Sequence, residues 1–447
     1  MRTLLRGATL VLPDGPARAD LLLDRGRFAH VGVPQGTRAD ETLDLTGLHV
    51  FPGAIDDQVH FREPGLTHKE DLESGSRAAA RGGVTTFFDM PNVNPTTTTV
   101  ARLHEKLARA AEVSHVHYGF FVGATGGNVA ELQRATRTPG IKVFIGSSTG
   151  DLLVDDQDAL ERLFAETTLP ITAHCEDETT VRANRTALLE EAARTVRALT
   201  PADHLCVRDH RAAEISAART IDLALRHRHR FHLLHVTSRG EIDLLRRTYQ
   251  NPDNRALVTA EACLPHLWFS STDYERLGTR LLQNPSVKHP EDRAALWDGL
   301  RDGTLQIVAT DHAPHTLDEK ARPYPDAPSG MPGIENSLVL MLTKAAEGWC
   351  SLADIARWMA DAPAQTWGLA TKGRIAEGFD ADLAVVDLAA RRTLRDAEQL
   401  TKCGWTPWDG VDVTADVVGT FVAGRRVYWR GAFDESVRGQ EAVFARG

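Results

Sequence analysis

At 447 residues the chain is too long for one average domain, although one barrel plus a smaller domain would fit. Apolar residues make up 42% and charged residues 25%, an ordinary soluble composition that leaves a large core to bury. The formal net charge of -10 disfavours nucleic acid or an anionic membrane as the main partner.

The N-terminal residues 1–7 lack the long apolar segment of a secretory signal, and no apolar run approaches the length of a membrane span. The five cysteines are scattered along the chain and form no CxxC pair, which indicates reduced thiols. These features together predict a cytoplasmic protein.

Three regions of different pattern follow one another along the chain. Residues 3–50 show short apolar strands separated by turns. From residue 54 onward, short β-branched runs alternate with longer amphipathic stretches, and from residue 373 the strands with tight turns return. We therefore predict a β-sandwich domain built from both chain ends, residues 1–52 and 371–447, beside a barrel formed by residues 53–370.

The middle region predicts eight strands, at 54–61, 84–90, 116–123, 141–146, 170–176, 231–237, 256–263 and 305–311. Helical patterns are found at 68–82, 99–112, 155–166, 208–226, 239–248, 291–302, 336–347 and 351–360. Eight strands that are each followed by helix fit an α/β protein with a (β/α)8 TIM-like barrel. A doubly wound open sheet is the alternative, but it usually has fewer strands and often a Gly-rich first turn, which this chain lacks.

Polar side chains that suit a metal site stand at the predicted strand ends, where barrels of this kind carry their active residues. These side chains are Gln58, His60 and Arg62 in the first strand, Asn92 after the second, His174 and His235 in the fifth and sixth, and Asp311 and His315 at the eighth. Imidazole and carboxylate ligands around one rim are what a zinc hydrolase requires. Any single histidine could instead be a hydrogen-bonded core residue.

Lys142 is unusual because it lies inside the apolar strand predicted at 141–146. A buried ammonium group is costly unless it is neutralised or paired. One interpretation is an uncharged amine that reacts with CO2, giving a carbamate that bridges two metal ions. The other is a lysine whose ammonium group extends to the barrel rim.

Five segments carry a specific combination of motifs, at residues 59–71, 90–95, 173–177, 310–315 and 328–335. With these motifs the chain resembles the dihydroorotases of the amidohydrolase superfamily, across the barrel and into both flanking β segments. The resemblance implies reversible hydrolysis of dihydroorotate to N-carbamoyl-L-aspartate, with one or two Zn²⁺ ions per chain.

The resemblance also implies a role for each matching residue. Metal ligands are implied at His60, Lys142, His174, His235 and Asp311; many relatives carboxylate the lysine on its side-chain nitrogen. Asp311 further matches the aspartate that moves the proton. Contacts to the substrate are implied for Arg62, Asn92 and His315, which match the groups that hold its carboxylate, and for Asn284 and Gly330, which match contacts to the ring.

Gln58 is the serious departure, because the family motif has His at this position. A glutamine can ligate zinc through its carbonyl oxygen, but more weakly than a neutral imidazole. We therefore expect a weakened or empty first metal site, a metal held mainly by Lys142, His174 and His235, or poor catalysis.

Two alternatives stay open. Hydantoinases, dihydropyrimidinases and allantoinases share the metal frame, but they generally lack the run that contains Arg62, and their uncharged rings give this arginine no partner. A weakly active or inactive protein that binds aspartate carbamoyltransferase is the second alternative. We expect a small-molecule substrate and a homodimer, with no nucleic acid or membrane as partner.

Overall fold

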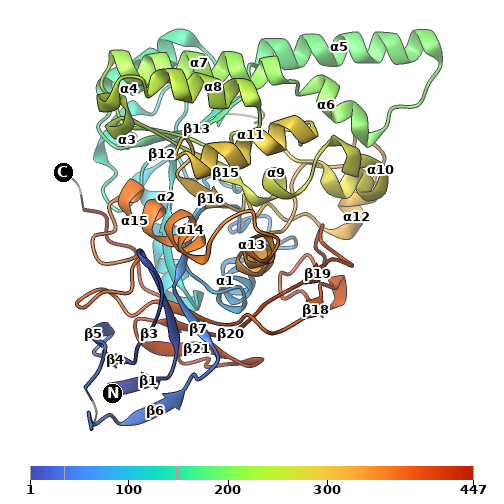
Figure 1. The fold of residues 1–447 in the computed structure, drawn as a ribbon. Coiled ribbons are helices and arrows are strands. Elements are labelled where there is room, and N and C mark those ends of the chain that lie inside the picture. The colour runs from blue at the N-terminus through green and yellow to red at the C-terminus, as the bar shows by residue number, and fades with distance from the viewer. Residues whose placement is uncertain (1, 35, 147–151, 446–447) are drawn as a thin grey trace.

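The structure is a computed structural model that describes residues 2–34, 36–146 and 152–445. An α/β barrel packs against a β-domain that contains the N-terminus (Figure 1). In the described residues, no helix is long and apolar enough to cross a membrane.

The barrel consists of parallel strands in chain order, as the alternating pattern predicts. They are Ala54–Val59 (β8), Val84–Asp89 (β9), His117–Phe120 (β10), Val122–Gly123 (β11), Ile141–Ile145 (β12), Ile171–Cys175 (β13), Phe231–Leu233 (β14), Val258–Cys263 (β15) and Ile307–Ala309 (β16). A parallel bridge between Val59 and His312 joins the last strand region to the first. The expected (β/α)8 barrel is confirmed.

The barrel strands are shorter than the sequence pattern suggests. The third strand is divided at Phe121, where β10 pairs with β9 and β11 pairs with β12. The sixth and eighth strands end at Leu233 and Ala309. His235 and Asp311 therefore lie just beyond strand ends, on turns that aim their side chains across the barrel mouth.

Helices cover the outside of the barrel. They are Leu72–Arg81 (α1), Val100–Val113 (α2), Val129–Arg134 (α3), Gln157–Glu166 (α4), Glu178–Thr195 (α5), His204–Val207 (α6), His210–Arg226 (α7), Arg239–Thr248 (α8), Leu264–Trp268 (α9), Tyr274–Leu277 (α10), Pro290–Arg301 (α11), Leu317–Lys320 (α12), Ser337–Ala346 (α13), Leu352–Ala356 (α14) and Ala362–Trp367 (α15). A π-helix, Arg357–Asp361, joins α14 to α15. All eight predicted helical patterns contain a helix.

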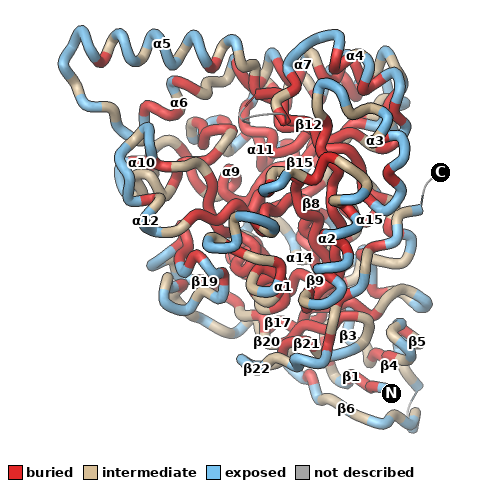
Figure 2. The backbone as a smooth tube through the Cα atoms, turned by 180° about the vertical axis from the view of Figure 1, so that it is seen from behind, coloured by how far each residue is buried: buried red, intermediate tan, exposed pale blue. Residues whose placement is uncertain are grey.

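The longest helix, α5, is absent from the sequence expectations. It projects from the barrel in Figure 1, and Figure 2 shows that most of its surface is exposed. Only Val181 and Ala192 of its 18 residues are buried. The helix therefore has no continuous apolar stripe, which is the signal that sequence periodicity detects.

The β-domain is built from both ends of the chain, as predicted. Its strands are Arg2–Arg6 (β1), Thr9–Leu12 (β2), Gly15–Arg18 (β3), Leu21–Asp24 (β4), Arg27–Val31 (β5), Glu41–Asp44 (β6), His49–Pro52 (β7), Leu383–Asp387 (β17), Asp416–Val422 (β20), Arg425–Trp429 (β21) and Ala432–Phe433 (β22). Antiparallel pairing of β7 with β17, with Val385 opposite Val50, joins the two ends in one sheet. The boundaries 52/53 and 370/371 stay a prediction.

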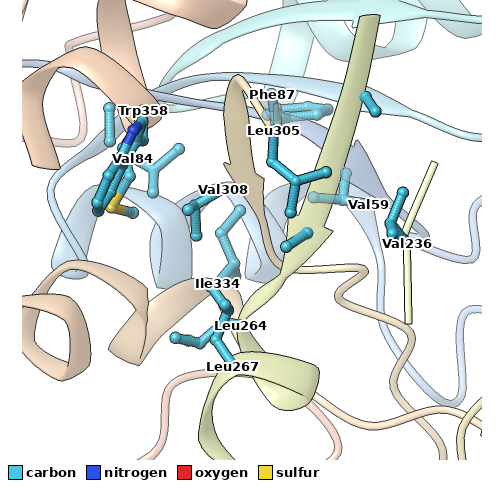
Figure 3. Close-up of a cluster of buried hydrophobic side chains, with 14 of the residues drawn as sticks. Val59, Val84, Phe87, Val236, Leu264, Leu267, Leu305, Val308, Ile334 and Trp358 are labelled. Carbon is cyan, nitrogen blue, oxygen red and sulfur yellow. The ribbon is translucent and has the colours of Figure 1, made fainter. Parts of the chain in front are cut away.

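Apolar side chains from the strands and from the covering segments form the main core beside the site. Figure 3 shows part of it, including Val59, Phe87, Val308, Ile334 and Trp358, all nearly inaccessible to solvent. Burial of large apolar side chains contributes roughly 1.5–3 kcal/mol each to folding. This packing fixes the ends of β8, β9 and β16, from which the site residues extend.

Candidate active site

One cavity at the C-terminal ends of the barrel strands brings together every site residue predicted from the sequence. It encloses about 110 Å³. Its lining comprises Gln58, His60, Arg62, Asn92, Lys142, His174, His235, Asn284, Asp311, His315 and Gly330, with Phe144, Gln283, Ala313 and Ser329 in addition. Residues more than 200 positions apart in the sequence thus share one small polar space.

Asp311 is the hub of the cavity's polar contacts. Its Oδ1 accepts a hydrogen bond from Gln58 Nε2 at 3.2 Å and lies 3.1 Å from His60 Nε2. Its Oδ2 accepts from Gln283 Nε2 at 2.9 Å. Burial alone would raise the pKa of Asp311, but the hydrogen bond and charge of His60, with further help from His235 and Gln283, hold it below its ordinary value. The carboxyl group is therefore ionised.

His60 is oriented so that one ring nitrogen faces Asp311. Its Nδ1 lies 2.7 Å from the amide oxygen Oδ1 of Asn92, so Nδ1 carries a proton and donates it. Without a metal ion, a proton on Nε2 makes the hydrogen bond to Asp311 Oδ1. A metal ion between the two side chains would replace this proton, and the ring would then present the lone pair of Nε2 beside the carboxylate oxygen. Two such electron-rich atoms at 3.1 Å fit two ligands of a single cation.

His174 and His235 form a second pair of possible metal ligands. Glu176 Oε2 lies 2.8 Å from His174 Nε2, leaving Nδ1 of this ring as an acceptor 3.0 Å from His235 Nε2. Ligands of one tetrahedral zinc ion lie about 3.3 Å apart, given zinc–nitrogen bonds of about 2.0–2.1 Å. Burial lowers the pKa of both rings, so each is neutral, as metal binding requires. A carboxylate behind a ligating imidazole is the usual support for such a site.

Lys142 points into the same cavity from β12. It is only 1% exposed, and its Nζ lies 4.6 Å from the centroid of the Phe144 ring. Burial lowers the pKa of its amine to about 8, against the opposing charges of Asp311 and Glu261. Within the part of the chain that the structure describes, no hydrogen-bond partner of this amine is found, which leaves its nitrogen available for reaction.

Gln58 lies beside His60, where the sequence predicts a metal ligand, but its side-chain amide is unfavourably oriented for this role. Its amide nitrogen donates to Asp311, and its Oε1 accepts a weak bond from Cys263 Sγ at 3.6 Å. The carbonyl oxygen would have to exchange places with the amide nitrogen before it could ligate a cation beside His60. The residues therefore fit a metal at Lys142, His174 and His235 better than one at Gln58 and His60.

Three of the predicted site residues have left-handed backbone conformations, which are costly for residues other than glycine. Their φ angles are 61° at Arg62, 35° at His235 and 48° at Asp311. The backbone N–H of His235 donates to Glu261 Oε1 at 3.3 Å, which helps to hold this conformation. Such strain is characteristic of sites whose geometry is over-determined by the surrounding fold.

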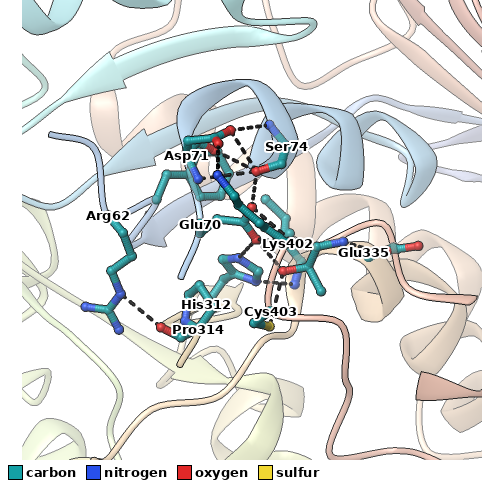
Figure 4. Close-up of polar contacts among 12 residues, drawn as sticks. Arg62, Glu70, Asp71, Ser74, His312, Pro314, Glu335, Lys402 and Cys403 are labelled. Carbon is teal, nitrogen blue, oxygen red and sulfur yellow. Dashed lines mark hydrogen bonds and ion pairs between the residues drawn. The ribbon is translucent and has the colours of Figure 1, made fainter. Parts of the chain in front are cut away.

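Cationic and polar groups gather on the opposite side of the cavity. Arg62 Nε donates to the carbonyl oxygen of Pro314 at 3.1 Å, as Figure 4 shows, and Arg62 Nη2 lies 3.4 Å from His315 Nε2. His315 Nε2 also lies 3.1 Å from the carbonyl oxygen of Ser329. Arg62 is 7% exposed, so its charge acts in a largely desolvated pocket.

The loop that contains Gly330 closes one wall. The φ angle of Gly330 is 129°, and a Cβ atom on this residue would come within 2.4 Å of the Ala313 carbonyl oxygen, so only glycine fits. The buried Lys320 ammonium group donates to the carbonyl oxygens of Pro328 and Gly330 at 2.8 and 3.0 Å. Burial, with the charge of Arg280, lowers the pKa of Lys320 to about 7.

A buried network ties the C-terminal part of the chain to the site loops. Glu70 accepts hydrogen bonds from Thr401 Oγ1 and from the backbone N–H of Lys402, and lies 3.5 Å from His312 Nε2 (Figure 4). Trp405 Nε1 donates to the carbonyl oxygen of His315 at 2.7 Å. Segment 401–405 therefore contacts the chain near Arg62, through Glu70, and the chain at His315.

A second group of possible metal ligands lies inside the barrel, formed by Asp57, His232 and Glu261. His232 Nε2 lies 3.0 Å from Glu261, and Trp367 Nε1 donates to Asp57 Oδ2 at 2.6 Å. Burial raises the pKa of both Asp57 and Glu261 to about 8, and for Asp57 the charge of Glu261 adds to this effect. This group shares no residue with the predicted ligands.

The sequence reasoning missed several residues that act on the cavity. Gln283 binds Asp311, Glu176 orients His174, and Lys69 contacts His315 at 3.0 Å. Glu176 and Lys69 stand inside motifs that were recognised, so their proximity to the site was detectable. The only sequence signal for Gln283 is that it stands directly before Asn284. Cys175 points away from His174 toward Thr220, as alternation along a strand predicts.

The fold and the cavity define a barrel protein whose polar site resembles that of a metal-dependent hydrolase. Residues 49–427 match the Amidohydrolase family, and the chain belongs to this family. A dihydroorotase of Methanothermobacter thermautotrophicus is 35% identical over 419 residues, covering 91% of this chain and 92% of the relative.

Relatives with other activities are also similar. An allantoinase of Deinococcus radiodurans is 34% identical over 446 residues, 98% of this chain and 97% of the relative. The solved L-hydantoinase of Arthrobacter aurescens superposes with a TM-score of 0.90 at 27% identity, covering 97% of each chain. Overall similarity therefore leaves the substrate to be decided by the residues of the cavity.

Proposed function

We propose that this protein is a dihydroorotase, which reversibly hydrolyses (S)-dihydroorotate to N-carbamoyl-L-aspartate in de novo pyrimidine biosynthesis. The observation that carries the proposal is the pairing of Arg62 and His315 within 3.4 Å on one wall of a cavity that also holds Asp311. Arg62 offers a planar, bidentate grip on a carboxylate. Dihydroorotate has such a carboxylate, whereas hydantoin, dihydrouracil and allantoin rings have none.

One or two Zn²⁺ ions complete the proposed site. Lys142, His174 and His235 would hold one ion, while His60 and Asp311, with Gln58 as a weak third ligand, would hold the other. Zinc supplies Lewis-acid activation of the ring carbonyl and of the attacking water. The facing nitrogens of His174 and His235, and the neutrality that burial imposes on both rings, support this assignment.

We further propose that Lys142 is carboxylated on Nζ. Only the neutral amine reacts with CO2, and a pKa of about 8 leaves roughly a tenth of the amine neutral at pH 7. The carbamate would carry a negative charge in place of the buried ammonium group. It would thereby convert a cation that repels metal into a ligand.

The chain's own residues would carry the proton chemistry. Arg62, His315 and Asn92 hold the substrate so that the ring amide faces Asp311. Water adds its oxygen to the ring carbonyl carbon while Asp311 accepts its proton. The carbon–nitrogen bond then breaks, and Asp311 returns the proton to the leaving ring nitrogen, which becomes the terminal nitrogen of the ureido group. Hydrogen bonds from Gln58 and Gln283 fix the carboxylate for both transfers.

An allantoinase is the second candidate, because its relative is nearly as similar over the whole chain. A third is a weakly active or inactive partner of aspartate carbamoyltransferase, which the orientation of Gln58 favours. We propose a homodimer that binds neither nucleic acid nor membrane. Dihydroorotate turnover by the zinc-supplied protein alone, without the transferase, would exclude the third candidate.

Arg62 provides the test of the proposed carboxylate grip. Arg62→Met should lower kcat/KM for dihydroorotate about 100-fold or more, because truncating one partner of a buried charge pair costs about 2–5 kcal/mol. Arg109→Met is the matched control: this arginine pairs with Glu63 outside the cavity. Steady-state kinetics of both variants should show a loss only for Arg62. Equal activity of Arg62→Met and the unmodified protein on dihydroorotate would remove the carboxylate grip from the proposal.

A further inference from the structure

Lys69 lies beside the cavity but has no part in the proposed proton chemistry. It belongs to the segment between β8 and α1, and only 12% of its side chain is exposed. Its Nζ lies 3.0 Å from His315 Nδ1 and 3.0 Å from Glu319 Oε1. The lysine therefore bridges a carboxylate and the outer nitrogen of an imidazole whose inner nitrogen faces the cavity.

The contact with Lys69 determines which nitrogen of His315 carries the proton. An ammonium group has three donors and no acceptor, so His315 Nδ1 must offer its lone pair. In a neutral imidazole the proton is then on Nε2. Glu319 Oε1 pairs with the lysine at 3.0 Å, and the other carboxylate oxygen of Glu319 lies 3.5 Å from His315 Nδ1, which is too far for a good hydrogen bond.

The proton on Nε2 is directed at the cavity wall. Its neighbours there are the Ser329 carbonyl oxygen at 3.1 Å and Arg62 Nη2 at 3.4 Å. Because Arg62 also has only donors, the contact between the two side chains is not a hydrogen bond. Two donors that lie side by side are suited to a shared acceptor with two oxygens.

Charges around His315 keep its ring neutral. The charged groups that face it are Arg62, Lys69, Lys320 and Glu319. Burial, followed by the charges of Arg62, Lys69 and Lys320, lowers the pKa of His315 far below its ordinary value. The ring thus donates from Nε2 without adding a second positive charge to that of Arg62.

We propose that Lys69 is a positioning residue that fixes the tautomer of His315, so that Nε2–H and Arg62 together bind the substrate carboxylate. This inference rests on the proposed function, since it concerns recognition of a carboxylated ring. Without Lys69, Glu319 is the one polar partner left near Nδ1 among the described residues, and it draws the proton to that nitrogen. Nε2 then presents a lone pair, which repels a carboxylate.

Lys69→Met tests the proposal, because methionine keeps the length of the side chain and removes the donor. KM for dihydroorotate should rise roughly tenfold with kcat within about twofold, as expected for loss of one hydrogen bond to a charged group. Lys69→Arg restores a donor and should recover most of the affinity. His68→Gln is the matched control, because His68 lies next in sequence, is 59% exposed and faces the same Glu319 at 3.7 Å.

A spectroscopic readout separates tautomer control from a structural effect. In the unmodified protein, the nitrogen chemical shifts of the His315 ring should show a proton on Nε2 and a lone pair on Nδ1. In Lys69→Met, the two shifts should exchange as the proton moves to Nδ1. Calorimetric binding of N-carbamoyl-L-aspartate should weaken by the same factor as KM rises, without depending on turnover.

An unchanged His315 tautomer in Lys69→Met, or a loss of kcat at unchanged KM, would overturn the proposal. So would an equal rise of KM in Lys69→Arg. Failure of the proposed function has a different signature, which is an unmodified protein that hydrolyses uncharged rings and leaves dihydroorotate intact.

Discussion

Asp311→Asn should lower kcat for dihydroorotate by about 10³-fold, because a positioned acid–base group contributes about 10²–10⁴-fold. Asparagine is nearly isosteric but cannot accept the proton at neutral pH. Its amide can still receive one of the hydrogen bonds that Gln58 and Gln283 now donate. The change therefore removes the chemistry of the carboxylate while preserving most of its packing.

Steady-state assays of dihydroorotate hydrolysis and of the reverse reaction, ring closure of N-carbamoyl-L-aspartate, measure this effect. Both reactions should lose activity equally. Gln283→Glu is not a suitable control, because it would place a second charge beside Asp311. Asp302→Asn is suitable, since Asp302 lies on the surface and pairs with Arg246. If Asp311→Asn kept more than about a tenth of the activity, Asp311 would not be the proton carrier.

Lys142→Ala should abolish tight zinc binding and reduce dihydroorotate turnover by at least about 10²-fold, as loss of a metal-site residue does. The reason is that alanine cannot form the anionic carbamate that would serve as a metal ligand. Added short carboxylic acids should partly restore activity by occupying the vacated space. Metal analysis of the dialysed protein measures the first effect, and kinetics with acetate or propionate measure the second.

Lys372→Ala is the matched control for the lysine variant. This lysine is also largely buried, but it pairs with Asp380 and Asp382 beside the β-domain. Its loss should leave the zinc content unchanged. Unaltered zinc in Lys142→Ala would remove Lys142 from the site, and absence of any rescue by carboxylic acids would argue against the carbamate.

Much of the fold was predictable because the barrel's apolar runs are periodic and separated by turns. The eight strand positions, eight of the covering helices and the β-domain from both chain ends follow from pattern and turn chemistry. The helix α5 could not be found this way, since it buries only Val181 and Ala192 and has no apolar stripe. Phe121 interrupts the third strand because the barrel changes hydrogen-bond partner there, which no local pattern encodes.

The candidate site was predictable at residues that lie within recognised motifs and whose side chains can bind a metal ion or an anion. His60, His174, His235 and Asp311 meet in one cavity because barrel strands place their ends around one rim. Gln283 was not predictable, since a glutamine before a turn has no distinctive signal. The tautomer of His315 depends on Lys69, 246 positions away, and only the folded chain brings the two together.

The substrate preference of the unmodified protein tests the central claim most directly. Purified, zinc-supplied protein should be assayed side by side with dihydroorotate, allantoin, hydantoin and dihydrouracil. The cationic wall formed by Arg62 and His315 predicts that kcat/KM for dihydroorotate exceeds that for each uncharged ring by about 100-fold or more. Turnover of allantoin or hydantoin with none of dihydroorotate would contradict the account.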